Sequence, residues 1–283
     1  MKKKMSNFTT SGLFPVLRDI AAPVVILYLA SFAAATAIMG AAGMLTGAGS
    51  FDADALTGVC PQLPLLCSIG GYALTLAAIL PLVRFDELRF GRTFPVIPLR
   101  KSAAAASVSG LAGSAASGHA KYTASGRGWR PGPRSVLYIA AVSVLAYAWS
   151  RILLHGPLPA LFPAYQEQAA GVFDGRFPAL MFLSYVLLGP VAEELVFRCC
   201  LYRRFRLRTG WPAAAVFSSL LFGIWHGNVI QFLYASVLGL ALAWGYEKSG
   251  RISLCIAAHI CANLLAFAVT VFSAGSVFGA CRM

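Results

Sequence analysis

An apolar run at residues 178–205 carries three charged side chains near its middle. The run reads PALMFLSYVLLGPVAEELVFRCCLYRRF, and the three charges are Glu193, Glu194 and Arg198. A charged side chain near the centre of a bilayer costs at least about 2.5–3.5 kcal/mol, so it is kept only where it is paired, wetted or used. The chain has ten acidic residues, and two of them stand side by side at this place. The sequence therefore predicts a polar site inside an apolar helix.

Composition indicates an integral membrane protein. Of the 283 residues, 58% are hydrophobic and 12% are charged, whereas soluble domains carry roughly 25% charged residues. A membrane-spanning helix needs about 20 predominantly apolar residues. Runs of this kind predict an all-α, polytopic membrane helix bundle of about seven spans with an intramembrane polar cavity. The predicted spans lie near residues 20–45, 62–83, 136–154, 178–200, 211–227, 229–247 and 252–274, and the fifth is the shortest.

The net charge of +13 is distributed in a pattern typical of membrane topology. Basic residues gather in alternate loops, at residues 2–4, 84–101, 121–134, 203–208 and 248–251. The intervening loops are poor in net positive charge, which is the positive-inside pattern. It predicts a cytoplasmic N-terminus and, with seven spans, an external C-terminus. The charge thus indicates contact with a lipid bilayer and not with nucleic acid.

The chain divides into two parts by the distribution of its polar motifs. Residues 1–135 hold predicted transmembrane helices and end in a segment rich in Ala, Ser and Gly, residues 102–135, which predicts a flexible cytoplasmic loop. Residues 84–101 mix aromatic side chains with arginines, a pattern that fits either a helix along the lipid headgroups or an ordinary basic loop. Residues 136–283 hold the polar motifs, all of them within residues 178–268.

The two adjacent glutamates are predicted to differ in role. Glu194 and Arg198 are four residues apart and share a helix face, so they predict a buried ion pair. Glu193 lies about 100° round the helix and has no local cation, which leaves it available as a general base. Upstream, Gly189 and Pro190 predict a kink or a helix start that opens room for water beside Glu193.

Two histidines lie in apolar segments downstream. His226 ends the run FSSLLFGIWH, with Phe222 one turn before it on the same face, and His259 is four residues from Asn263 in AAHICAN. Two hydrolytic uses remain open for these groups. Glu193, His226 and His259 suit a divalent metal ion such as zinc. The same residues, with Asn263, also suit a water that Glu193 deprotonates and an oxyanion that His and Asn stabilise.

These motifs resemble those of a known family. EELVFR, FGIWH and HICAN match E-E-x-x-x-R, F-x-x-x-H and H-x-x-x-N, in order and inside apolar segments. They resemble the motifs of the CAAX prenyl protease and bacteriocin-processing family of intramembrane proteases, also called abortive-infection proteins. The resemblance covers roughly residues 178–268, and residues 1–135 show no motif.

The resemblance implies roles for the motif residues. Glu193 looks like the base that activates water, His226 like the second-motif histidine, and His259 and Asn263 like the third-motif pair, with Asn263 helping to stabilise the oxyanion; Glu194 and Arg198 look like the supporting pair. It implies a membrane-associated substrate, either a prenylated or a leader-type peptide, and a bacterial plasma membrane as the location. Metal dependence, substrate identity and oligomeric state stay open.

Three other functions remain as alternatives. The same fold serves equally well as a non-enzymatic bacteriocin-immunity or scaffold protein, because fold does not fix function. A proton-coupled transporter would use Glu193 and the histidines as a relay. A cysteine protease is disfavoured, because the seven cysteines include no C-x-x-C motif and are expected to be buried free thiols.

Overall fold

The structure, a computed structural model, describes residues 13–46, 53–90, 131–162 and 176–280, and within these ranges it is built from helices without a strand. Six of the described helical segments are long and apolar enough to cross a membrane, and a seventh apolar helix has 15 residues. The predicted all-α polytopic bundle is thereby confirmed. The elements are α1 (Leu13–Thr46), α2 (Ala53–Val59), α3 (Leu63–Phe90), α4 (Pro133–His155), α5 (Leu158–Leu161), α7 (Pro178–Met181), the π-helix η4 (Phe182–Leu188), α8 (Gly189–Glu194), the π-helix η5 (Leu195–Tyr202), α9 (Arg203–Arg206), α10 (Trp211–Trp225), α11 (Val229–Ser249) and α12 (Ile252–Ala280).

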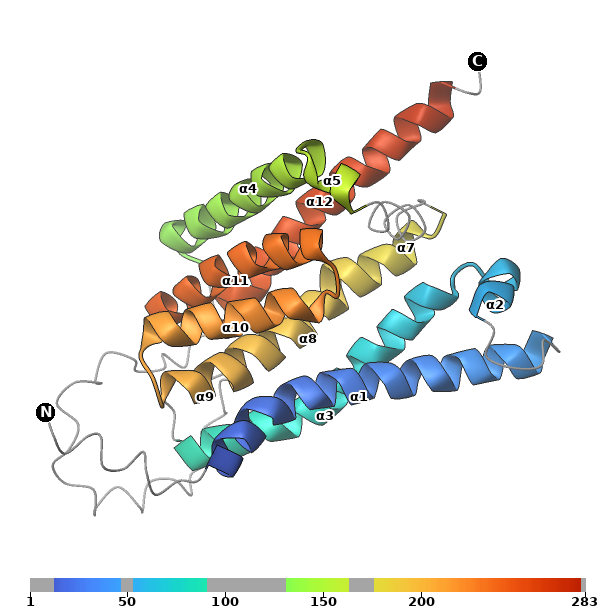
Figure 1. Ribbon diagram of the computed structural model, residues 1–283. Coiled ribbons are helices and arrows are strands. Elements are labelled where there is room, and N and C mark those ends of the chain that lie inside the picture. Colours follow the sequence, from blue (N-terminus) through green and yellow to red (C-terminus); the bar gives the residue numbers. More distant parts are fainter. Residues whose placement is uncertain (1–12, 47–52, 91–130, 163–175, 281–283) are drawn as a thin grey trace, which may run out of the picture.

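The helices run back and forth along one direction, as in a membrane bundle (Figure 1). α1 and α3 form one antiparallel pair, and α10 and α11 form another, with α4 and α12 on the far side of the second pair (Figure 1). The connections α9–α10 and α11–α12 lie at one end of the bundle, and the α10–α11 connection lies at the other (Figure 1). The two basic clusters at residues 203–208 and 248–251 therefore share an end, as the alternating charge pattern requires.

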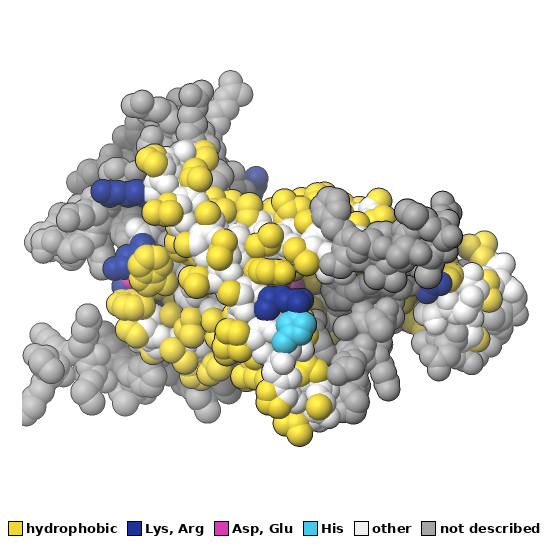
Figure 2. All heavy atoms as spheres, turned by 90° about the horizontal axis from the view of Figure 1, so that it is seen from above, with side chains coloured by type: hydrophobic (Ala, Val, Ile, Leu, Met, Phe, Trp, Pro, Cys, Tyr) yellow, Lys and Arg dark blue, Asp and Glu magenta, His cyan; other side chains and the backbone are white. Residues whose placement is uncertain are grey.

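The surface of the bundle suits a lipid environment. Figure 2 shows a face covered mostly by hydrophobic side chains, with few charged ones among them. The exposed side chains of α4 include Leu137, Val144, Leu145 and Ile152. Because water penalises so large an apolar surface, this face is expected to contact acyl chains.

The segment from Pro178 to Arg206 is a continuous rod at the centre of the bundle. Of the six candidate spans it is the most buried. It packs against α1 and α3 on one side and against α10 and α12 on the other. The two parts of the chain separated in the sequence at residue 135 thus meet along this rod.

The rod changes helix type on both sides of the glutamates. η4 ends where the N–H of Gly189 donates to Ser184 O, five residues back, and the next residue, Pro190, has no N–H to donate. A proline inside a helix removes one hydrogen bond and crowds the preceding turn, so a local change of winding is the expected result. The kink or helix start predicted at this point takes the form of a π-to-α transition. Such transitions are frequent at functional sites.

Several predicted segments fall outside the described residues. These include residues 91–130, which hold most of the expected cytoplasmic loop and of the aromatic, arginine-containing stretch. Residues 84–90 continue α3 as a helix.

Candidate intramembrane active site

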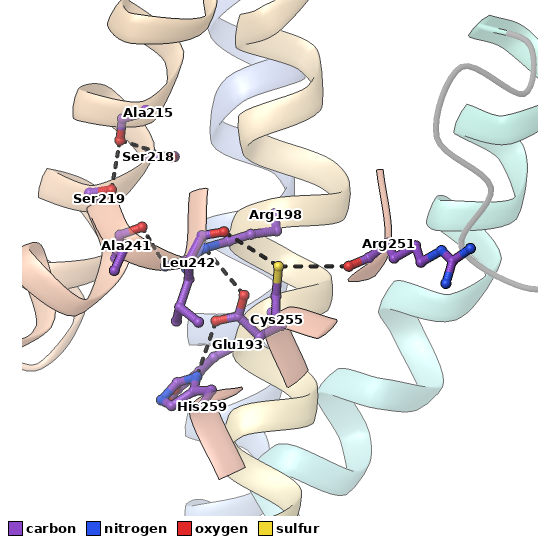
Figure 3. A network of polar contacts seen from close by, with 12 residues as sticks. Glu193, Arg198, Ala215, Ser218, Ser219, Ala241, Leu242, Arg251, Cys255 and His259 are labelled. Atoms are coloured by element: carbon purple, nitrogen blue, oxygen red, sulfur yellow. Dashed lines mark hydrogen bonds and ion pairs between the residues drawn. The ribbon is translucent and has the colours of Figure 1, made fainter. Parts of the chain in front are cut away.

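Glu194 and Arg198 form the ion pair expected from their spacing. Oε2 of Glu194 lies 3.2 Å from Nε of Arg198, and both side chains are fully buried. The contact has the distance of an ion pair without the alignment of a hydrogen bond. Arg198 also donates from Nη2 to Gly239 O of α11 at 3.2 Å, and its guanidinium lies 4.7 Å from the centroid of the Phe222 ring in α10. Arg198 therefore ties the central rod to both helices of the α10–α11 pair (Figure 3).

His259, from α12, lies between the two glutamates. Its Nδ1 is 3.1 Å from Glu194 Oε1, and its Nε2 is 3.8 Å from Glu193 Oε2. A carboxylate oxygen only accepts, so Nδ1 carries the proton when Glu194 is ionised. Nε2 is then the ring atom turned toward Glu193, and the partner of Nδ1 fixes this orientation.

Glu193 is 5% exposed and has a partner that the sequence did not reveal. The hydroxyl of Tyr72, in α3, donates a hydrogen bond to Glu193 Oε1 at 3.2 Å. Tyr72 belongs to residues 1–135, where no motif was found. The only sequence signal is a tyrosine after two glycines in an apolar run, and that pattern is too common in membrane helices to single out a site residue.

His226 stands at the C-terminal end of α10 and is half-buried. Its Nδ1 lies 2.9 Å from Phe222 O. Because a carbonyl only accepts, Nδ1 is the protonated nitrogen, and Nε2 of the neutral ring is an acceptor. The Phe222 ring contacts both imidazoles edge-on, at 5.0 Å from His226 and 5.7 Å from His259 between ring centroids. Phe222 thus connects the second-motif histidine to the buried network.

The chain turns sharply after His226. Gly227 has a φ of 72°, a left-handed conformation that favours glycine, and Asn228 caps α11 by accepting a hydrogen bond from the Gln231 N–H at 2.8 Å. This turn fixes where α10 ends and so where the His226 ring stands.

Asn263 lies one turn beyond His259 on α12. Its Nδ2 donates to Tyr185 O of η4 at 2.8 Å. His259 and Asn263 therefore both face the central rod, as their four-residue spacing predicts. The bond to Tyr185 uses one of the two amide hydrogens of Asn263.

The donor groups do not assemble as a three-ligand metal centre. In the part of the chain that the structure describes, no group of three or more His, Cys, Asp or Glu side chains is placed to hold one metal ion. A structural or catalytic zinc site needs at least three protein ligands. Since the arrangement does not supply them, no step is derived through a metal, and the metal requirement stays a prediction.

Together these contacts define a class of protein: a membrane-embedded helix bundle with a buried site of two carboxylates, an arginine, a histidine and a tyrosine, and with a second histidine and an asparagine attached to its edges. The cysteines of the described residues are free thiols, and Cys199 and Cys200 are buried.

Comparisons with known proteins identify the family. Residues 175–265 match the model of the family described as type II CAAX prenyl endopeptidase Rce1-like. An 84-residue stretch is 31% identical to a Bacillus subtilis (strain 168) protein named "Putative membrane peptidase YdiL", covering 30% of this chain and 34% of that protein. The chain thus spans about a third of the length of this curated relative. No solved structure matches the chain. Through this C-terminal segment the chain belongs to the CAAX prenyl protease and bacteriocin-processing family, as its three motifs predict.

Proposed function

We propose that the protein is an intramembrane endopeptidase that hydrolyses a peptide bond with a water activated by Glu193. The observation that carries this proposal is the division of labour between the two glutamates. Glu194 pairs with Arg198, whereas the buried Glu193 faces Nε2 of His259 at 3.8 Å. A buried carboxylate beside an imidazole, away from the arginine, suits proton transfer better than structural pairing.

The proposed reaction begins with water held beside Glu193 and His259. Glu193 takes a proton from this water while the water oxygen bonds to the peptide carbonyl carbon, and the carbonyl oxygen becomes an oxyanion. The second amide hydrogen of Asn263 is the proposed donor to that oxyanion. When the intermediate collapses, the C–N bond breaks and Glu193 passes its proton to the departing amine nitrogen.

His226 has a different proposed task. With Nδ1 bonded to Phe222 O, the neutral ring presents Nε2 as an acceptor. It therefore suits binding a water or a substrate N–H at the edge of the site rather than donating to the oxyanion.

The proposed substrate is a membrane-associated peptide, either prenylated or of the leader type. The Rce1-like family description and the peptidase name of the B. subtilis relative support a peptide substrate. The apolar walls around Glu193 suit a segment that is itself lipid-soluble.

The test is cleavage by purified protein in proteoliposomes. Two peptides are offered, a farnesylated CaaX peptide and a membrane-anchored leader peptide, and products are identified by mass spectrometry. Glu193→Gln keeps size and hydrogen bonding but removes proton acceptance, so activity is expected to fall by about 10²–10⁴-fold at unchanged melting temperature.

Glu247→Gln is the matched control. Glu247 pairs with Arg206 at 2.9 Å and accepts from Tyr202 at 2.6 Å, away from the site. Its substitution is expected to leave cleavage at the wild-type rate. Full activity in Glu193→Gln would refute the mechanism and favour the immunity or scaffold function.

A further inference from the structure

Tyr72 approaches the central rod more closely than ordinary helix packing allows. Its hydroxyl donates to Glu193 Oε1, and its ring lies against the backbone of Gly189, one turn earlier. A Cβ at position 189 would stand 3.2 Å from Tyr72 Cζ and 3.3 Å from Cε2. The missing side chain of Gly189 thus provides the space that lets the Tyr72 hydroxyl reach the carboxylate.

The helix that carries Tyr72 is itself closely held by α1. A Cβ at Gly71 would stand 3.1 Å from the Ser31 Cα, and one at Gly70 would stand 3.3 Å from the Ala34 Cβ. Small residues let membrane helices pack backbone to backbone, which restrains both partners. Tyr72 therefore projects from a braced helix pair and not from a lone helix.

We propose that Tyr72 is a positioning residue for Glu193, and that the α1–α3 pair, which lies outside the family match, completes the active site. The Tyr72 hydroxyl holds Oε1, so Oε2 is kept toward His259 Nε2 as the atom that receives the proton. A catalytic carboxylate with one oxygen fixed spends less time in unproductive rotamers, which raises the rate of the chemical step. The inference rests on the proposed function of Glu193.

Four groups from the surrounding elements set the charge state of Glu193. They are Tyr72 from α3, Tyr185 from η4, Arg198 from η5 through its pair with Glu194, and His259 from α12. Replacing Tyr72 by Phe removes one hydrogen-bond donor and leaves the other groups, and the ring packing against Gly189, in place.

The kinetic test compares Tyr72→Phe with Tyr138→Phe on the farnesylated peptide in proteoliposomes. Tyr138 is a matched control, since its hydroxyl donates to Ala241 O at 2.8 Å, between α4 and α11 and outside the site. For Tyr72→Phe we expect kcat to fall about tenfold or more with KM unchanged. The acidic limb of the kcat profile is expected to move to higher pH, because a carboxylate that loses a donor binds its proton more tightly. Tyr138→Phe is expected to keep wild-type kcat and pH profile.

A second kinetic comparison separates positioning from general stability. Glu193→Asp retracts the carboxylate by one methylene, out of reach of the Tyr72 hydroxyl. In that background, Tyr72→Phe is expected to cause no further loss of kcat, because its effect acts through Glu193. An additive loss in the double variant, or wild-type kcat in Tyr72→Phe, would overturn the inference.

An infrared measurement tests the contact without any substrate. At low pH, the carbonyl band of protonated Glu193 is identified by its absence in Glu193→Gln. Losing the Tyr72 donor is expected to move this band to higher frequency in Tyr72→Phe but not in Tyr138→Phe. An unmoved band would refute the positioning role. Failure of Glu193→Gln to lower activity would instead refute the proposed function, so the two failures are distinguishable.

Discussion

The Nε2 atom of His259 lies 3.8 Å from the Oε2 atom of Glu193. This separation exceeds a direct hydrogen bond, which for N and O atoms is about 2.7–3.2 Å. It suits two groups that hold a common water from the side, since polar contacts beyond about 3.5 Å are often bridged. The Nδ1 contact with Glu194 keeps the ring from rotating away. The pair is thus positioned for proton transfer and not for mutual neutralisation.

Removal of the His259 ring is expected to abolish this arrangement. His259→Ala should lower peptide cleavage by about 10²–10⁴-fold, as Glu193→Gln does, because the water loses one of its two anchors. Cleavage and melting temperature are measured together. A His259→Ala protein with wild-type kcat would contradict a shared water site.

Substitution of Glu194 is expected to act through stability. Glu194→Gln leaves Arg198, which is fully buried, without its counter-charge, and breaking a buried pair costs roughly 3–5 kcal/mol. Adding Arg198→Gln is expected to restore part of the lost stability, since the uncompensated charge is removed. Thermal unfolding in detergent measures all three variants. Equal melting temperatures for Glu194→Gln and wild type would show that the pair contributes no stability.

The sequence predicted the fold and the fixed spacings within single helices, but not the contacts between distant helices. Apolar run lengths gave the seven helices to within a few residues at most ends, and the four-residue spacings gave the Glu194–Arg198 pair and the common face of His259 and Asn263. Tyr72 was missed because its role depends on α3 crossing the rod at Gly189, which no local pattern encodes. The π-helical segments were missed for a similar reason: proline predicts a disturbance, but tertiary packing decides its form.

The topology prediction is a cytoplasmic N-terminus and an external C-terminus. The structure places the basic clusters at residues 203–208 and 248–251 at one end of the bundle (Figure 1), and the positive-inside rule assigns that end to the cytoplasm. Reporter fusions after Gly49, Ser102 and Gly171 are expected to read outside, inside and outside. An external signal from the Ser102 fusion would reverse the orientation.

The two nitrogens of His226 permit a test that separates a structural role from a catalytic one. Nδ1 bonds to Phe222 O and so helps to end α10, whereas Nε2 is the nitrogen proposed to face water or substrate. His226→Asn places an amide N–H near the position of Nδ1 and removes Nε2. We expect this variant to keep the wild-type melting temperature and to lose at least about 100-fold in cleavage rate, the lower range for a proton-handling group. His226→Ala, which removes both nitrogens, is expected to lose stability as well. Retained activity in His226→Asn would mean that His226 serves only to cap α10, and that Glu193, His259 and Asn263 suffice for the chemistry.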